Sequence, residues 1–133
     1  MVTLENLNLL GGAAVLEEIF HNFSDMGYCK AYPTQFCAKE VGLFSLGLIE
    51  VPPLQKTLLM DAMIVARAGD WGDDTPSEYP AAAWYKYTEP SCVSGCQLSE
   101  YAWHAFSSYI NYQAFNPAYA TGIASEWSIT SRA

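Results

Sequence analysis

Two cysteines and a histidine in the C-terminal half of the chain are spaced in a way that suits metal binding. Cys92 and Cys96 are four residues apart, and His104 follows eight residues later. Structural zinc sites use thiolate and imidazole ligands, with two to four residues between the members of a pair. The sequence therefore permits a zinc site at Cys92, Cys96 and His104, with Cys29, Cys37 or His21 as its fourth ligand. The alternative is that these thiols are simply buried, because free cysteine packs like a small apolar side chain.

The histidines also have carboxylates near them. Glu18 precedes His21 by three residues, the Glu-x-x-His spacing that helix bundles use for paired metal ions. Such a centre needs a second copy, and the only other histidine, His104, has Glu100 four residues before it rather than three. This mismatch argues against a carboxylate–histidine centre. We interpret Glu17 and His21 as an exposed pair one helical turn apart.

An acidic stretch with aromatic neighbours occupies residues 69–80. Carboxylates beside aromatic rings suit a contact with a basic protein surface, because Trp and Tyr are common anchors of protein interfaces. The alternative is a solvated loop whose Trp folds inward. The predicted partner-binding residues are the acids and rings of this loop and the first two aromatic residues after it: Asp70, Trp71, Asp73, Asp74, Glu78, Tyr79, Trp84 and Tyr85.

The charge of the chain narrows the range of partners. Fourteen acidic residues face six basic ones, which gives a formal net charge of −8. Direct nucleic-acid binding depends on Lys and Arg to displace counterions, and attraction to an anionic membrane surface depends on the same residues. Both are therefore disfavoured, and the partner we expect is a protein with a basic surface, or another copy of the chain. Alternatively, the charge serves only to keep the domain in solution.

The predicted compartment follows from the N-terminal sequence and from hydropathy. The chain begins without a basic segment, and its apolar stretch at residues 7–16 is broken by Asn8, Gly11 and Gly12, unlike a secretory signal. It lacks a run of about 18 apolar residues, so no membrane span is expected. We therefore expect a cytoplasmic protein, in which the four cysteines are mostly reduced.

The elements that position these residues are predicted to be helical. Apolar residues recur at three- and four-residue steps, which predicts helices at 13–26, 34–41, 54–68 and 98–115. Gly27 is expected to end the first helix, Thr34 to cap the second and Ser99 to cap the last. The 54–68 segment is apolar on most of its circumference, so we place it at the centre of the fold. Residues 81–88 fit either a helix or a strand.

The predicted fold is a single domain over residues 1–133. It is all-α or predominantly α, a small bundle of four to five helices with at most a minor β element near 81–88. The acidic loop at 69–80 separates an apolar helical half from an aromatic-rich half. The pattern leaves open whether the tail at 118–133 packs on the bundle.

The leading function is a protein-interaction domain with an acidic, aromatic-rich surface. Two versions are an inhibitor of a nucleic-acid-binding complex, of the kind that phages and mobile elements encode, and a subunit of a larger assembly. The alternative is a small metal- or cysteine-dependent enzyme that uses Cys92, Cys96 and His104. The sequence contains no Gly-x-Ser-x-Gly, phosphate-binding glycine loop or His-Glu-x-x-His, so no motif supports an enzyme.

Overall fold

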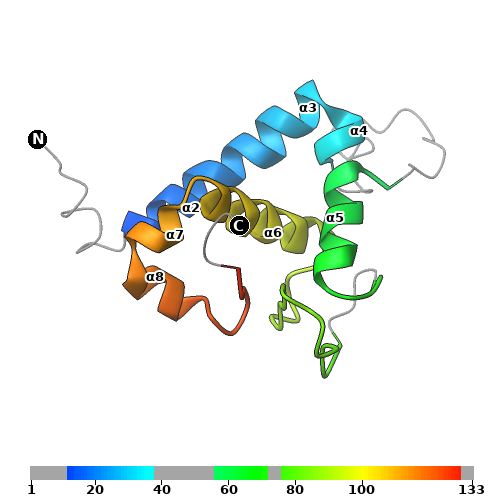
Figure 1. Ribbon diagram of the computed structural model, residues 1–133. Coiled ribbons are helices and arrows are strands. Elements are labelled where there is room, and N and C mark those ends of the chain that lie inside the picture. Colours follow the sequence, from blue (N-terminus) through cyan, green and yellow to red (C-terminus); the bar gives the residue numbers. More distant parts are fainter. Residues whose placement is uncertain (1–11, 38–55, 72–75, 130–133) are drawn as a thin grey trace, which may run out of the picture.

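The protein is predominantly helical, which confirms the predicted fold class. The structure is a computed structural model that describes residues 12–37, 56–71 and 76–129. Figure 1 shows a long N-terminal rod lying across a second long helix, with shorter helices at both ends. The elements are α2 (Gly12–Asn22), η1 (Phe23–Tyr28), α3 (Cys29–Ala31), α4 (Pro33–Phe36), α5 (Leu58–Ala66), α6 (Ser94–Tyr109), α7 (Tyr112–Phe115) and α8 (Pro117–Gly122).

The N-terminal rod consists of α2, η1 and α3. A helix was predicted at 13–26 and is confirmed, but its predicted end at Gly27 is wrong. Gly27 lies inside the π-helical turn η1, where the Cys29 N–H donates to the Ser24 carbonyl. The rod ends at Tyr32, whose backbone leaves the helical region at φ −138° and ψ 65°. The following Pro33 explains this end, because proline disfavours helical geometry in the residue before it.

Helix α4 is only four residues long and does not begin at the predicted cap. It starts at Pro33, with Tyr32 in the N-cap position. The Thr34 hydroxyl donates instead to the Gln35 side chain. Proline suits the first helical position because the amide hydrogen that it lacks would have no partner there. The predicted extent of 34–41 is wrong, because α4 ends at Phe36 and Cys37 has extended backbone with φ −71° and ψ 144°. Residues 38–41 lie outside the described residues.

Helix α5 is shorter and more exposed than the sequence predicted. The Thr57 side chain caps it by accepting from the Met60 N–H, and its C-terminal end turns through Ala68, which adopts a left-handed φ of 53°. Leu58 and Val65 are each 68% exposed. The prediction that the 54–68 segment is the central helix is therefore wrong, because only one side of α5 packs against the rest of the protein.

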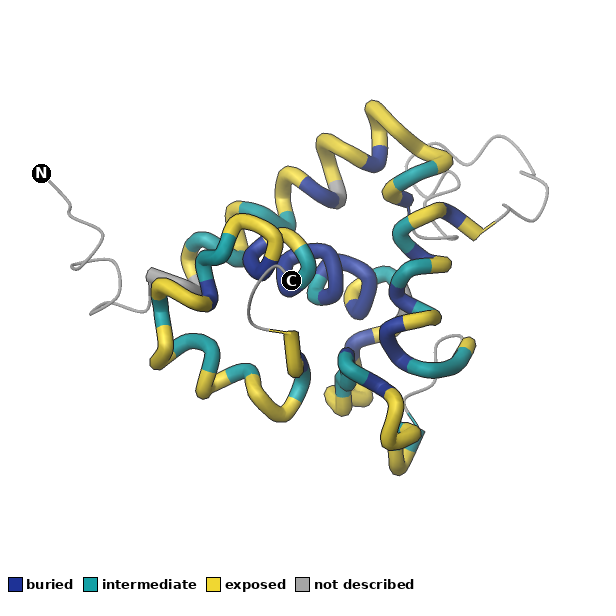
Figure 2. Tube along the Cα trace, in the orientation of Figure 1, coloured by how far each residue is buried: buried dark blue, intermediate teal, exposed yellow. Residues whose placement is uncertain are grey.

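The most buried helix is α6, which is mostly dark blue in Figure 2. It begins at Ser94, so Ser99 is an interior residue and not the predicted cap. The predicted helix at 98–115 is split in two by Asn111, whose φ of 60° is left-handed. Asparagine adopts this conformation more easily than most residues, and α7 follows directly after it.

The core lies between α5, α6 and the C-terminal tail. Tyr85 and Trp127 form a single antiparallel bridge, which is the β structure within the 81–88 segment. The tail is docked as far as Ile129, since the Ser108 hydroxyl donates to the Ile129 carbonyl at 2.5 Å. The buried core cluster consists of Met60, Met63, Ala66, Tyr85, Leu98, Tyr101 and Trp127.

Two disulfides join all four cysteines. Cys29 pairs with Cys37, and Cys92 pairs with Cys96. Their Cα atoms are 4.5 Å and 5.2 Å apart, within the range that a disulfide spans. The expectation of reduced thiols is therefore wrong. That expectation followed from the predicted cytoplasmic location. In the structure, the paired cysteines are only eight and four residues apart in the sequence, so the local chain path brings each pair together.

No helix in the described part of the chain combines the length and the apolarity that a membrane crossing requires.

Candidate metal centre

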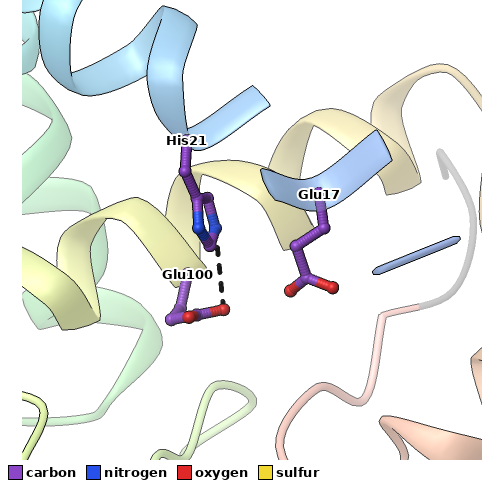
Figure 3. A group of neighbouring side chains, drawn as sticks. All are labelled: Glu17, His21 and Glu100. Carbon is purple, nitrogen blue, oxygen red and sulfur yellow. Dashed lines mark ion pairs between the residues drawn. The ribbon is translucent and has the colours of Figure 1, made fainter. Parts of the chain in front are cut away.

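The crossing of α2 and α6 brings two glutamates and a histidine together. Glu17 and His21 are four residues apart, so they lie on one face of α2. Figure 3 shows both side chains projecting from α2 toward Glu100 of α6. One ligand atom from each residue lies within 4.8 Å of the other two. This is the one group of three such ligands among the described residues, and we call it the EHE cluster.

Aromatic packing between α2 and α6 holds the EHE cluster in place. Phe20, between Glu17 and His21 on α2, stacks on Phe106 of α6 with ring centroids 5.0 Å apart. Phe20 also contacts Trp103, at 5.5 Å between centroids. Both rings belong to α6, the helix that carries Glu100. These contacts fix the crossing point of the two helices and so fix the spacing of the three ligands.

Within the cluster, the negative charges are not offset by a lysine or arginine in any ion pair that the structure records. His21 Nε2 lies 3.8 Å from Glu100 Oε2, which is the cluster's ion pair. All three side chains are partly buried. His21 Nε2 is itself buried and has no hydrogen-bond partner. An unsatisfied nitrogen beside two carboxylates is the arrangement that a cation would complete.

Burial and repulsion by neighbouring carboxylates raise the pKa of Glu17. Burial raises the pKa of its carboxyl group, and the charge and hydrogen bond of Glu100 raise it further, to about 8. The Glu126 carboxylate contributes in the same direction. Glu17 therefore keeps its proton near neutral pH and shares a hydrogen bond with Glu100. A metal ion would take the place of that proton, because ligating carboxylates bind in their ionised form.

A second histidine–glutamate pair lies beside the cluster. His104 is 1% exposed, and its Nε2 is 3.6 Å from Glu126 Oε2. Neither ring nitrogen of His104 has a hydrogen-bond partner. The ring stacks on Trp127, with centroids 5.5 Å apart and planes at 22°. The aromatic core therefore fixes the orientation of His104 without satisfying its polar atoms.

Three tyrosines near the cluster have raised pKa values, to which its glutamates contribute. Burial raises the pKa of Tyr87 to about 12, and Glu100 and Glu126 act in the same direction. Burial also raises the pKa of Tyr85, again reinforced by Glu100, and that of Tyr119, reinforced by Glu17. Burial is the largest cause of each shift, and the nearby glutamates add to it.

The predicted zinc ligands are not brought together. The Cys92 and Cys96 sulfurs are bonded to each other, so in this form neither is a thiolate that a metal could bind. Among the described residues these two cysteines form no ligand group with His104. Cys29 and Cys37 are also joined to each other, and His21 belongs to the EHE cluster instead.

The predicted partner-binding residues divide into exposed and buried ones. Asp70 and Glu78 are exposed, and Asp70 pairs with Lys56. Trp71 is partly buried against Tyr79, whose hydroxyl donates to the Tyr87 carbonyl at 2.7 Å. The Trp71 ring therefore packs inward. This agrees with the alternative interpretation of residues 69–80, a solvated loop whose Trp folds inward. Asp73 and Asp74 lie outside the described residues.

The two aromatic residues after the loop belong to the interior. Trp84 is half-buried against Trp127, with ring centroids 5.3 Å apart. Tyr85 is fully buried, and its hydroxyl donates to the Gln97 carbonyl at 2.7 Å. The prediction that Tyr85 contacts a partner is therefore wrong: the ring fills the core.

The Glu-x-x-His spacing does not detect the EHE cluster, because Glu17 and His21 are four residues apart. Glu17 and His21 were interpreted as an exposed surface pair, but His21 contacts Glu100 in the partly buried crossing of the two helices. The signal that was available is a repeat of Glu-x-x-x-His, at Glu17–His21 and again at Glu100–His104. A four-residue step puts both members on one helical face as well as a three-residue step does.

Comparison with known proteins gives no matching family model, no matching curated protein and no matching solved structure.

Proposed function

We propose that this chain is a metal-binding domain whose centre consists of Glu17, His21 and Glu100. The observation that carries the proposal is the convergence of three ligand atoms within 4.8 Å at the crossing of two packed helices. The buried, unpartnered Nε2 of His21 supports it, because such a nitrogen is costly unless something binds it.

The donor set favours a divalent first-row transition metal. Two carboxylates and one imidazole match zinc, iron or manganese, whereas calcium takes oxygen ligands alone and Cu(I) prefers sulfur. Three protein ligands leave a coordination position for water, which is the pattern of catalytic rather than structural zinc. Such a centre would polarise a bound oxygen atom, so hydrolysis is the reaction class that best fits it.

The disulfides bear on where the protein works. Four cysteines in two disulfides favour an oxidising compartment over the cytoplasm, where thiols are kept reduced. We therefore propose an oxidising environment in place of the cytoplasmic one. In that setting the carboxylate–imidazole centre also has an advantage over a thiolate centre, since its ligands are not lost to oxidation.

The direct test is a native mass spectrum of the disulfide-bonded protein after equilibration with zinc and removal of excess metal. We expect the wild type to retain zinc and Glu100→Gln to lose it. Glu18→Gln is the matched control, because Glu18 is exposed and lies next to Glu17 on α2. Retention of zinc by Glu100→Gln at the wild-type level would remove the proposed centre.

A second candidate is the interaction domain, and one surface favours it. Phe23 and Met26 are 62% and 63% exposed and line a shallow apolar hollow with Ile19 and Asn22. Large exposed apolar side chains that cluster are typical of protein contacts. We place the contact on this rod surface and not on the acidic loop, where Asp70 is already paired with Lys56.

This second candidate is tested by sedimentation at increasing protein concentration. Self-association through the rod predicts a wild type that forms dimers and a Phe23→Ser, Met26→Ser double variant that stays monomeric. Both should bind zinc equally, because neither residue belongs to the EHE cluster. A wild type that stays monomeric at every concentration would exclude self-association.

A further inference from the structure

The two disulfides differ in how far solvent reaches their cysteines. Cys29 and Cys37 are both buried, at 3% and 8% exposed. The second disulfide is asymmetric, because Cys92 is 4% exposed whereas Cys96 lies on the surface. A thiolate can attack a disulfide only at a sulfur that it can reach. Of the four cysteines, Cys96 is therefore the one open to attack in the folded protein.

The backbone of Cys92 is fixed by hydrogen bonds that do not involve its sulfur. The Cys92 N–H donates to the Glu89 carbonyl at 3.1 Å, and the Cys92 carbonyl accepts from Gln97 Nε2 at 2.6 Å. Gln97 is fully buried, and its own carbonyl accepts from the Tyr85 hydroxyl at 2.7 Å. Because these contacts do not depend on the sulfur–sulfur bond, Cys92 should stay beside Cys96 when that bond is broken.

The place of Cys96 on its helix supports the same chemistry. Cys96 lies in the first turn of α6, a helix of 16 residues whose first turn contains no acidic residue. The amide groups of a first helical turn carry partial positive charge, which stabilises a thiolate. The Glu89 carboxylate, upstream of the helix, accepts hydrogen bonds from the Ser91 N–H and hydroxyl. The helix therefore favours Cys96 as the leaving group when a mixed disulfide is resolved.

We propose that Cys92–Cys96 is a thiol–disulfide exchange site that oxidises dithiols, with Cys96 as the attacked residue and Cys92 as the resolving residue. A substrate thiolate attacks Cys96 Sγ, the bond between the two cysteines breaks, and Cys92 leaves as a thiolate that takes up a proton. The second substrate thiol then loses its proton and attacks the substrate sulfur of the mixed disulfide. Cys96 leaves as a thiolate and is protonated in turn. The substrate loses two electrons and two protons in forming its disulfide, and the cysteine pair gains both.

The anchored position of Cys92 selects for a substrate with two thiols. After the first step, the Cys92 thiolate can attack Cys96 Sγ, re-form the original disulfide and expel the substrate. A monothiol is returned unchanged by this reaction, whereas a second thiol on the same substrate competes with it and completes the oxidation. The inference is independent of the proposed metal centre, since neither sulfur belongs to the EHE cluster.

The test mixes the folded, disulfide-bonded protein with an excess of a reduced peptide that contains two cysteines, without oxygen or metal. Free thiols are trapped by alkylation at successive times and located by mass spectrometry. We expect Cys92 and Cys96 to be alkylated in step with peptide oxidation, at least about tenfold faster than Cys29 and Cys37, because buried sulfurs react only after a local opening. The matched control is the same peptide with one cysteine replaced by serine, which should reduce the protein at least about tenfold more slowly because tethered Cys92 outcompetes it.

Two variants identify the attacked sulfur. Cys92→Ser leaves Cys96 free and should form a stable mixed disulfide with oxidised glutathione, whereas Cys96→Ser, whose remaining thiol is buried, should not. The wild-type time course carries the test if a variant does not fold.

Three results would overturn the inference: equal reactivity of the two disulfides, because exchange would then follow unfolding; a mixed disulfide on Cys92 in Cys96→Ser; or a peptide that stays reduced. Each leaves the proposed function untouched, because zinc binding is measured separately on the disulfide-bonded protein.

Discussion

Two regions that share α6 differ in how far their buried polar groups are satisfied by hydrogen bonds. In the aromatic core, the Tyr85 hydroxyl donates to the Gln97 carbonyl and the Trp127 ring nitrogen donates to the Ser108 hydroxyl, both at 2.7 Å. In the EHE cluster, His21 Nε2 lacks a hydrogen bond. The core leaves single amide oxygens of Gln97 and Gln113 without a partner, whereas the EHE cluster combines an unsatisfied imidazole nitrogen with two carboxyl groups whose charges repel each other. This difference is the basis of the proposal that one side of α6 mainly stabilises the fold and that the side carrying Glu100 binds a metal ion.

The largest expected effect lies in the core. Trp127→Ala should lower the free energy of unfolding by about 3–5 kcal/mol, because it removes a fully packed aromatic side chain and leaves a cavity. Glu17→Gln should cost the metal-free protein little stability at neutral pH, since the carboxyl group that it replaces is already protonated there and glutamine is also neutral. Urea denaturation of both metal-free variants checks this. An equal decrease in the free energy of unfolding in the two variants would contradict the proposed difference between the regions.

The next largest effect is on metal affinity. His21→Ala should weaken zinc binding more than about 100-fold, since even residues that only support a ligand account for about 10–100-fold. Its effect on folding should be small, because His21 makes no recorded hydrogen bond through Nε2. Isothermal titration calorimetry gives the affinity, and circular dichroism confirms the fold. An affinity within threefold of the wild type would count against His21 as a ligand.

Removing a disulfide separates stability from metal binding. Replacing Cys92 and Cys96 with serine should lower the free energy of unfolding by about 2 kcal/mol, as expected for closing a short loop. Zinc affinity should stay at the wild-type level, because neither sulfur belongs to the EHE cluster. Parallel urea denaturation and calorimetry measure the two quantities. Loss of zinc in the folded variant would restore the thiolate site that the sequence suggested.

A further effect is a change of stability with pH. The pKa of Glu17 lies at about 8 in the folded protein, above its ordinary value of 4.5. Between these values the folded state holds a proton that the unfolded state releases, so stability falls as pH rises through this window. We expect the urea midpoint of the metal-free wild type to fall from pH 5 to pH 8, and to fall less in Glu17→Gln. An identical pH profile in both proteins would contradict the assignment.

Much of the fold could be predicted because it depends on local periodicity. The apolar steps along 13–26 and 98–115 indicated helices, and Pro33 and Asn116–Pro117 mark helix boundaries that steric rules explain. The central position of α6 was not predictable in the same way. Tyr101 and Trp103 are buried by contacts with segments distant in the sequence, including the tail around Trp127 and Tyr119.

The EHE cluster could be predicted only in part. Each Glu-x-x-x-His pair is visible in the sequence, and each is placed on one helical face by the helix itself. What joins Glu17 and His21 to Glu100 is the crossing of α2 and α6, which depends on the packing of Phe20 against Trp103 and Phe106. Sequence spacing also favours a zinc site at Cys92 and Cys96 that the structure does not contain, since the same spacing suits a disulfide.

The most direct test of the central claim is anomalous diffraction from a crystal of the disulfide-bonded protein grown with zinc and measured at the zinc absorption edge. The account predicts an anomalous peak within bonding distance of Glu17, His21 and Glu100, at the crossing of α2 and α6. A zinc-saturated crystal with no peak at that crossing, or with its zinc bound only to surface acids such as Asp70 or Glu78, would contradict the account.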